Sequence, residues 1–436
     1  MCSVGDDGDA VANVREKLSC LGRKCMKCEN DAFIITRMND PFCQECFTVY
    51  VVHKFRSAIG KSKIVRDGDQ VLLMYSGGQA STALLHLVIE GLSERAHKKL
   101  RFKPVILHID ESAVLGMTDE KRQENLSEVL KIMKKTGFPY YLSSIEQALD
   151  LSIEPKRELF KHMETTEDIY KRQEEKITSL QSLLSSIKTL TAREDFIKNL
   201  RNQLMLSISG QLGYSKIMTG DTNSRLAVNI LNHVAQGRGA QVAYSTGFCD
   251  NRYKDIVILR PIRDLSIKEV AVYNQMNKLD SVFIPTLSTK APSISSIEKL
   301  TEKFVTGLQA DYLSTVSNIV RTGEKLGVSD EEINNESCIF CQSSIDTNVG
   351  PASALVAVEF SEKLSKEGRQ ATSSTDTISD RRNEIKKKLC YGCRVTLSEI
   401  DDIHQLPEFI KTNTLDQNRL KMKNEIEEYL LQPDDN

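Results

Sequence analysis

A strand-like apolar run that leads into a glycine turn and then into a helix is the feature that most constrains the fold of this chain. The run ends near Tyr75, and Ser76, Gly77 and Gly78 form the turn. Glycines at such a turn expose backbone N–H groups, and the start of the following helix attracts anions. The turn is therefore a candidate phosphate-binding loop, with Ser76, Gly77, Gly78 and Ser81 as its contact residues.

The sequence around the turn indicates a parallel sheet. A lone Ser-Gly-Gly is also found at simple strand-to-helix turns, so the phosphate-binding interpretation depends on the pattern of strands and helices around it. Three further short apolar runs follow at 104–110, 215–220 and 255–260, and helical patterns such as Thr118 to Lys135 separate them. Alternating strands and helices favour an α/β fold in which helices cover both faces of a parallel sheet and ligands bind beyond the carboxyl ends of the strands.

One residue of the turn departs from what nucleotide chemistry needs. The turn resembles Ser-Gly-Gly-x-Asp-Ser, the signature of PP-loop ATP pyrophosphatases, which use ATP to activate a carbonyl carbon for attack by sulfur or nitrogen. Where that family has an Asp, this chain has Ala80. A carboxylate beside a polyphosphate is the expected ligand of Mg²⁺, and a methyl group cannot replace it. The sequence thus predicts the fold of an ATP-using enzyme without its chemistry.

Eight of the eleven cysteines form four C-x-x-C pairs. The first two pairs are separated by residues 29–42 and the last two by residues 342–389. The first spacing is close to that of tetrahedral zinc sites with four cysteine ligands, and the long second spacer does not forbid a shared ion because loop-closure entropy grows only slowly with length. Buried reduced or redox cysteines are the alternative. We predict two structural zinc sites, one formed by Cys25, Cys28, Cys43 and Cys46 and the other by Cys338, Cys341, Cys390 and Cys393.

Length and composition predict a globular chain of several domains. The 436 residues are 40% hydrophobic, which is enough for a sizeable core. No apolar run approaches the ~20 residues of a membrane span, and the acidic first residues are unlike a targeting peptide. We therefore predict a cytoplasmic location, where reducing conditions favour metal binding over disulfides.

Charge is unevenly distributed along the chain. Residues 15–66 contain eleven Lys and Arg against five Asp and Glu, whereas residues 399–436 contain four against ten. A basic first module is suited to a phosphate backbone, although its lysines could equally be solvated surface. The acidic end is interpreted as a solvated helix and tail.

A charged helical segment interrupts the sheet pattern between 154 and 201. Ile177, Leu180, Leu184 and Ile187 follow three-four spacing, which predicts an amphipathic hairpin. Packing of this stripe inside the chain is the favoured interpretation, and a partner-binding stripe is the alternative.

These patterns divide the chain into six parts. We predict a flexible N-terminus (1–14), a zinc module (15–60), a PP-loop α/β core (61–290) with a helical insertion at about 154–195, a helical segment (291–334), zinc knuckles (335–398) with a disordered loop at about 343–384, and an acidic helix and tail (399–436).

Together, the basic four-cysteine module, the altered PP-loop and the terminal C-x-x-C pairs resemble the cytoplasmic tRNA 2-thiolation protein 2 family from about residue 15 to 394. Gly220-Asp-Thr-Asn223 and Arg260-Pro-Ile-Arg-Asp264 occur in matching order. Active thiolases of this branch have core cysteines that hold an iron–sulfur cluster or handle sulfur, and an acidic run that this chain lacks after Gly220. No cysteine occurs here between Cys46 and Cys249. The resemblance therefore implies a non-catalytic subunit, with no catalytic residue to nominate.

The resemblance also implies partners and cofactors. The family accompanies an active PP-loop tRNA thiolase that, after ATP-dependent adenylation, replaces the 2-oxygen of the wobble uridine with sulfur in cytoplasmic lysine, glutamine and glutamate tRNAs. Sulfur comes from a ubiquitin-related modifier. Expected partners are thus the thiolase, tRNA and the modifier, with no membrane. Zinc is the expected cofactor, without an iron–sulfur cluster, and the altered loop weakens the expectation of ATP binding. Candidate tRNA contacts are Arg23, Lys24 and Lys27.

Two alternatives stay open from the sequence. In the first, the chain is an active ATP-dependent thiolase or ligase that uses Asp110 or Asp221 as its metal ligand. In the second, it is a zinc-dependent RNA or protein adaptor unrelated to thiolation.

Overall fold

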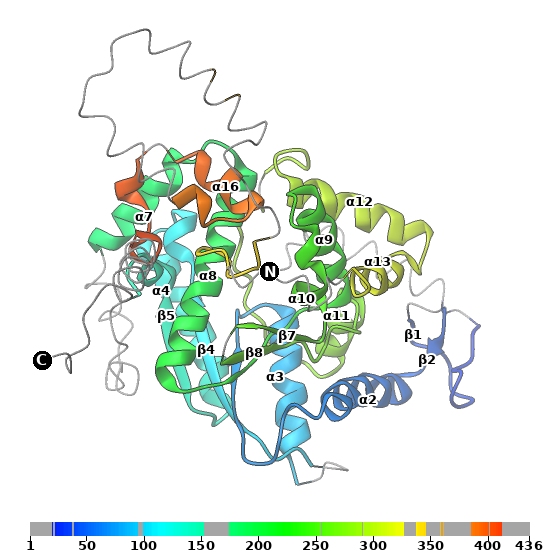
Figure 1. Cartoon of the computed structure of the whole chain (residues 1–436). Helices are drawn as coiled ribbons and strands as arrows, with labels where there is room; N and C mark the ends of the chain where they lie inside the picture. Colours follow the sequence, from blue (N-terminus) through cyan, green and yellow to red (C-terminus); the bar gives the residue numbers. More distant parts are fainter. Residues whose placement is uncertain are drawn as a thin grey trace, which may run out of the picture.

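The computed structural model describes residues 20, 22–36, 39–94, 99–151, 174–253, 255–289, 291–326, 337–345, 358, 361, 385–400 and 402–411. A central sheet carries helices on both faces (Figure 1). The predicted flexible N-terminus at 1–14, most of the predicted loop at 343–384 and the tail beyond 411 lie outside the described residues.

The central sheet has six strands in the order β5-β4-β3-β6-β8-β7. All neighbouring pairs are parallel except β7 with β8. The strands are β3 (Gln70–Met74), β4 (Lys103–Asp110), β5 (Tyr140–Ser144), β6 (Lys216–Met218), β7 (Cys249–Tyr253) and β8 (Ile256–Leu259). The sequence predicted β3, β4, β6 and β8 but missed β5 and β7. Only two residues separate β7 from β8, too few for the crossover that a parallel neighbour requires, so β7 is antiparallel.

Side-chain alternation along β3 assigns each helix to a face of the sheet. Val71 and Leu73 belong to one buried cluster, whereas Leu72 belongs to another. The Val71 face is covered by α2 (Gln44–Ser62), α3 (Gln79–Leu92), α4 (Asp119–Lys135) and α11 (Ile267–Met276). The Leu72 face is covered by α7 (Glu174–Ser186), α8 (Leu190–Leu212) and α16 (Tyr391–Ser398).

The two cysteine-rich modules pack on opposite faces of the sheet. Cys25 and Cys43 belong to the cluster on the Val71 face, and Cys338 and Cys390 belong to the cluster on the Leu72 face. Figure 1 shows the corresponding elements, the β1–β2 hairpin and α16, on different sides of the molecule. The hairpin consists of β1 (Ile34–Ile35) and β2 (Pro41–Phe42).

The first module is joined rigidly to the core. Helix α2 begins after Cys43 and ends at Ser62, so it crosses the predicted domain boundary at residue 60. Tyr50 donates a hydrogen bond to Glu269 on α11 at 3.0 Å, and Lys268 donates to the Ile35 carbonyl at 3.2 Å. The module and the core therefore share a helix and a polar contact surface.

The predicted amphipathic stripe packs inside the chain. Leu180, Leu184 and Ile187 are buried in the cluster on the Leu72 face. The second helix of the hairpin, α8, begins after the N-cap Thr189 and continues through the predicted end of the insertion at 195 to Leu212. The end of the predicted insertion thus leads into a helix that packs on the Leu72 face of the sheet.

A third cluster completes the fold beside the carboxyl edge of the sheet. It joins α9 (Asn223–Ala235) and α10 (Val242–Thr246) to α12 (Ile297–Asp311) and α13 (Thr315–Gly323), the helices predicted for 291–334. None of the described helices combines the length and the apolar character needed to span a bilayer. Short 3-10 helices complete the described elements at Ser112–Leu115, Ile145–Leu149, Gly239–Gln241 and Ile403–Gln405.

An ion pair attaches α12 to α9. Arg225 lies 2.7 Å from Glu298, whose side chain is 16% exposed, and it is the main reason that the pKa of Glu298 falls from 4.5 to about 2. Because the folded-state pKa is lowered, this pair stabilises the fold above about pH 4.5, and the contribution is lost as pH falls toward 2.

We predict that Glu298→Gln lowers the free energy of unfolding by about 1–3 kcal/mol at pH 7 and by less at pH 3. Urea unfolding at both pH values measures the difference. Glu302→Gln, one turn further along α12, is the matched control and should change stability little. An equal loss in the two variants would mean that the pair does not hold α12.

Candidate functional site at the switch point of the sheet

Two loops meet at the carboxyl edge of the sheet between β3 and β6. The strand order reverses here, because β4 and β5 lie on one side of β3 and β6 lies on the other, and open parallel sheets bind ligands at such points. Gly220, after β6, lies against the turn that follows β3. A Cβ atom at this position would lie 3.0 Å from the Ser81 nitrogen and 3.1 Å from the Ala80 carbonyl carbon, which are tight contacts, so glycine favours this approach.

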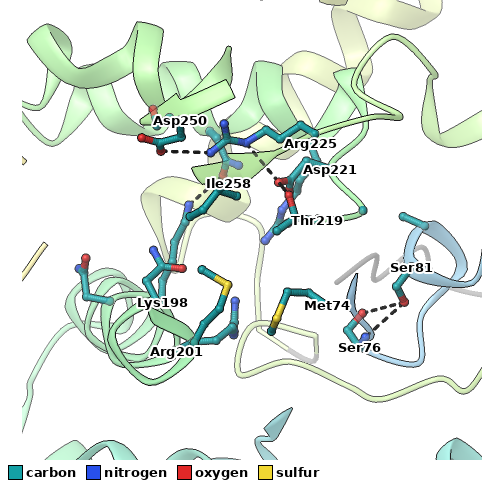
Figure 2. A pocket seen from close by; sticks show the side chains of 18 of the residues that line it. Met74, Ser76, Ser81, Lys198, Arg201, Thr219, Asp221, Arg225, Asp250 and Ile258 are labelled. Atoms are coloured by element: carbon teal, nitrogen blue, oxygen red, sulfur yellow. Dashed lines mark hydrogen bonds and ion pairs between the residues drawn. The ribbon is translucent and has the colours of Figure 1, made fainter. Parts of the chain in front are cut away.

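The predicted phosphate-binding turn is formed. Gly77 has φ +84°, which favours glycine, and α3 begins directly after the N-cap Gly78. The Ser81 hydroxyl accepts a hydrogen bond from the Ser76 N–H at 3.3 Å, contacts the Ser76 hydroxyl at 3.2 Å and donates to the Gly78 carbonyl at 2.9 Å (Figure 2). Since Gly78 has no side chain, the first N–H groups of α3 have no side-chain cap from this position.

A pocket of about 270 Å³ lies in front of this turn. Ala80 and Ser81 form one wall, and side chains from α8, α9, β7 and β8 form the other, as Figure 2 shows for part of the set. The cationic lining residues are Lys198, Arg201, Arg225, Arg238, Arg252 and Arg260, and the carboxylates are Glu111, Asp195, Asp221 and Asp250.

The sequence did not point to most of this lining. Arg260 falls within the Arg-Pro-Ile-Arg-Asp motif, and Asp221 was proposed as a metal ligand. The other charged lining residues occur on helices, on β7 or in loops, without a local pattern that separates them from solvated charges.

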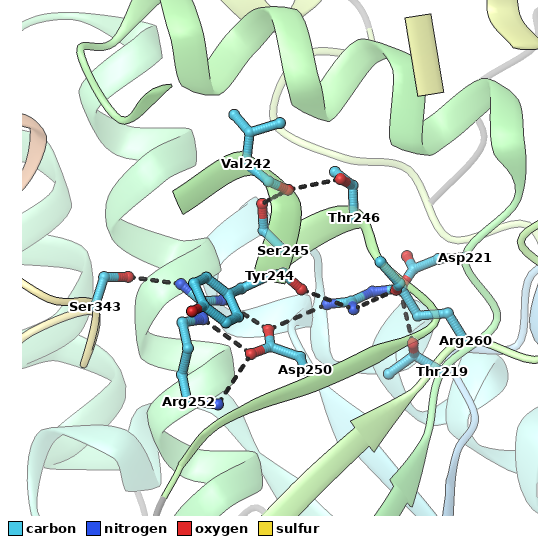
Figure 3. A network of polar contacts seen from close by, with 11 residues as sticks. Thr219, Asp221, Val242, Tyr244, Ser245, Thr246, Asp250, Arg252, Arg260 and Ser343 are labelled. Atoms are coloured by element: carbon cyan, nitrogen blue, oxygen red, sulfur yellow. Dashed lines mark hydrogen bonds and ion pairs between the residues drawn. The ribbon is translucent and has the colours of Figure 1, made fainter. Parts of the chain in front are cut away.

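Asp250 lies at the centre of a polar network beside the pocket (Figure 3). It accepts a hydrogen bond from Arg252 at 2.7 Å and lies 3.4 Å from Arg260, which is also 3.4 Å from Asp221. Burial alone would raise the pKa of Asp250, but the two arginines outweigh burial and hold the pKa below its ordinary value. Both carboxylates are therefore neutralised by neighbouring arginines.

Lys198 differs from the arginines. Its ammonium group donates to the Asn229 side-chain oxygen at 2.9 Å, and within the described part of the chain it forms no ion pair with a carboxylate. Burial lowers the pKa of Lys198. Lys198 thus places a positive charge in the pocket that no neighbouring carboxylate neutralises by direct contact.

The two acids of the enzyme alternative occupy different positions. Asp110 is buried, accepts from the Ser112 N–H at 2.9 Å, faces Arg122 at 3.4 Å and does not line the pocket. Asp221 does line the pocket, where it accepts from Thr219 at 2.7 Å and pairs with Arg260. The structure does not bring the two carboxylates together into one metal site.

The four C-x-x-C pairs combine two by two. In each group the four sulfur atoms lie within 4.8 Å of one another, and individual separations include 3.6 Å for Cys28–Cys43 and 3.6 Å for Cys341–Cys390. Four thiolates around one zinc at ~2.3 Å would be about 3.8 Å apart. Both groups therefore fit a single tetrahedral metal ion. Cys20 and Cys249 belong to neither group.

One cysteine of the first group has local support as a thiolate, whereas the hydrogen bond with Cys43 raises the pKa of Cys46 to about 12. Burial opposes ionisation of Cys25, but hydrogen bonds from the backbone N–H groups of neighbouring residues outweigh it and lower the pKa of Cys25 to about 6. On the same module, Arg23, Lys24 and Lys27 are exposed. Lys24 pairs with Asp31 at 2.5 Å, and Arg23 donates to Asn39 at 2.9 Å. These three candidate tRNA contacts thus lie together on an accessible surface.

Comparisons with known proteins identify the family to which the chain is similar. Residues 296–395 match the model of the family described as cytoplasmic tRNA 2-thiolation protein 2. The chain is 38% identical to the protein of that name from Danio rerio, with 100% of both chains covered, and 32% identical to that from Homo sapiens, with 94% of both covered.

Among solved structures, the U34-tRNA thiolase NcsA from Methanococcus maripaludis, described with its [4Fe-4S] cluster, has a similar fold. The TM-score is 0.51 at 15% identity, and the match covers 70% of this chain and 87% of the thiolase. At this identity the likeness concerns the fold alone. The full-length relatives are decisive, and the chain belongs to the cytoplasmic tRNA 2-thiolation protein 2 family.

Proposed function

We propose that this protein is a non-catalytic subunit of the cytoplasmic complex that 2-thiolates the wobble uridine of lysine, glutamine and glutamate tRNAs. The observation that carries the proposal is a well-formed PP-loop turn with Ala80 in place of the metal-binding carboxylate. Family membership supports the role in tRNA 2-thiolation, and the similarity to a thiolase fold is consistent with pairing to an active PP-loop subunit.

The charges of the pocket argue against independent catalysis. Each of its four carboxylates is paired with an arginine: Glu111 with Arg201, Asp195 with Arg238, Asp221 with Arg260, and Asp250 with Arg252. Mg²⁺ needs oxygen ligands with negative charge close to the phosphates it neutralises. Recruiting any of these acids would break an ion pair in the pocket, so the enzyme alternative is disfavoured.

The proposed role assigns the chemistry to partners. An active PP-loop subunit adenylates the uridine, the ubiquitin-related modifier supplies sulfur to the complex, and this chain supports the active subunit and contributes basic surface for tRNA. Copurification tests this arrangement against an unrelated zinc-dependent adaptor, which would carry no thiolase.

The sulfur spacing supports zinc as the structural metal at both four-cysteine groups. Zinc bound by four thiolates is tetrahedral, and it supplies folding energy to small modules. An iron–sulfur cluster places several metal atoms between its thiolates and therefore needs wider separations than the 4.8 Å limit found within each group. Cys25, Cys28, Cys43 and Cys46 would hold one ion, and Cys338, Cys341, Cys390 and Cys393 the other.

We expect purified protein to contain two zinc ions per chain, as measured by elemental analysis. Changing Cys25 and Cys28 together to Ser should remove one equivalent and lower solubility, because that module loses its folding energy. Cys249→Ser, outside both groups, should keep both ions. Stoichiometric iron with visible absorption would contradict the assignment.

We expect the basic module to contribute to tRNA binding. Changing Arg23, Lys24 and Lys27 together to Glu should weaken binding by the assembled complex and flatten its salt dependence, because fewer counterions are released. Binding titrations at several salt concentrations provide the measurement. As a control, the exposed Lys121, Lys131 and Lys134 on α4 are changed together to Glu. If both triple variants behave alike, the effect is one of total charge rather than of this surface.

The catalytic question has a direct test. Given ATP, Mg²⁺ and unmodified tRNA, the isolated chain should release no AMP or pyrophosphate above background, as followed by nucleotide chromatography. Ala80→Asp should not create activity, because the acidic run after Gly220 and the sulfur-handling cysteines would still be absent, and groups that act as a unit are not recovered singly.

Deletion of the gene should nevertheless abolish wobble 2-thiouridine, as measured by nucleoside mass spectrometry of bulk tRNA. Thiolation that persists without this protein would refute the accessory role. ATP-dependent thiolation by the isolated chain would instead establish the active-enzyme alternative.

A further inference from the structure

The C-terminal four-cysteine group is part of the pocket wall. Cys341 and Ser343 both line the pocket. The Ser343 hydroxyl accepts a hydrogen bond from Arg252 at 2.6 Å, and Arg252 in turn donates to Asp250 (Figure 3). The Ser343 carbonyl also accepts from the Cys338 N–H at 2.8 Å. Through these contacts the Cys338–Cys341 pair connects the C-terminal four-cysteine group to the polar network around Asp250.

Arg238 connects the same site to α8. Its guanidinium lies 3.5 Å from the Cys393 sulfur and donates to both carboxylate oxygens of Asp195, one of them at 2.7 Å. Asp195 also accepts from the Thr396 hydroxyl at 2.7 Å. Since Cys393 and Thr396 are three residues apart on α16, the four side chains form a closed ring between α16, Arg238 and α8.

The backbone is shaped to bring these groups together. A Cβ atom on Gly392 would lie 2.4 Å from Arg238 Nε, and one on Gly237 would lie 2.6 Å from the Tyr391 ring. Gly237 also has φ +72°, a conformation that side chains disfavour. Glycine at both positions therefore allows the second C-x-x-C pair to pack directly on residues 237 and 238.

The charge expected at the metal site gives a reason for a buried arginine beside it. Four thiolates around one divalent cation carry a net charge of about −2, which is costly to bury without a counter-charge. Arg238 is buried, with 4% of its side chain exposed, and supplies both a positive charge and an N–H donor to a ligand sulfur. Groups that contact metal ligands in this way orient them and tune metal affinity.

We propose that Arg238 is the positioning residue that couples metal binding at the C-terminal four-cysteine group to the shape of the pocket. With the metal bound, the ring through Asp195 and the contact of Ser343 with Arg252 fix two sides of the pocket. Loss of the metal releases both sides. This inference rests on the metal proposed above for this group, but not on the role in tRNA thiolation, because it holds whatever the pocket binds.

The first experiment measures metal release from the full chain after addition of a chelator, with a colorimetric zinc indicator. Arg238→Met should release one of the two metal equivalents roughly 10–100-fold faster than the unaltered chain. Arg238→Lys should have an intermediate effect, because an ammonium group keeps the charge but cannot reproduce the planar, bidentate contact.

Arg122→Met is the matched control. Arg122 also has 4% of its side chain exposed, but its ion-pair partners are Asp110 and Glu146, whereas Arg238 contacts the sulfur of a cysteine in the group. It should leave metal release unchanged. If Arg238→Met does not fold, Thr396→Val removes a single donor to Asp195 and should accelerate release from the same site more mildly. Equal release rates in the Arg238 and Arg122 variants would overturn the proposal.

The second experiment measures the coupling to the pocket by hydrogen exchange. Changing Cys338 and Cys341 together to Ser should speed exchange in residues 190–212 and 241–253, which contain Asp195 and Arg252. The corresponding change of Cys25 and Cys28 in the other module should leave these segments protected. Identical exchange in the two double variants would show that the metal site and the pocket wall are not coupled.

Discussion

The parallel pairing of β3 with β6 is the constraint on which the rest of the structure depends. It places the turn after β3 beside Gly220, where the absence of a side chain allows the two backbones to approach closely. The same pairing creates the point where the strand order reverses, and thereby the pocket. The side chains of β3 alternate between two buried clusters. Each cluster contains the helices of one face of the sheet and one of the two cysteine modules.

None of these contacts involves a carboxylate at position 80. The turn is held by Gly77, by the hydroxyls of Ser76 and Ser81, and by the strand pairing, so the fold can persist where the metal ligand is lost. The acids that line the pocket are paired with arginines. One pair joins α8 to residue 238 after α9, and Arg260, after β8, pairs with Asp221 after β6 and with Asp250 on β7. The pocket thus lies at the switch point of the sheet, and its carboxylates pair with its arginines.

The features that the sequence predicted are those with a local signal. The glycine turn, four of the strands and the C-x-x-C pairs follow from neighbouring residues, and the grouping of the cysteines follows from the number of ligands that a tetrahedral ion needs. β7 was missed because its buried Asp250 and half-buried Arg252 interrupt the apolar pattern of a strand. Arg238 and Asp195 are 43 residues apart, and neither has a local signature of their contact. Pairing of this kind is decided by the fold and cannot be read from either segment alone.

The two cysteine modules consequently have different relations to the pocket. The first is attached to α11 through Tyr50 and Lys268 on the opposite face of the sheet, and its charged side chains are exposed there. The second contributes Cys341 to the pocket lining and is packed against Arg238 without room for a side chain at Gly392. The C-terminal four-cysteine group therefore contacts an edge of the pocket that the pairing of β3 with β6 does not reach.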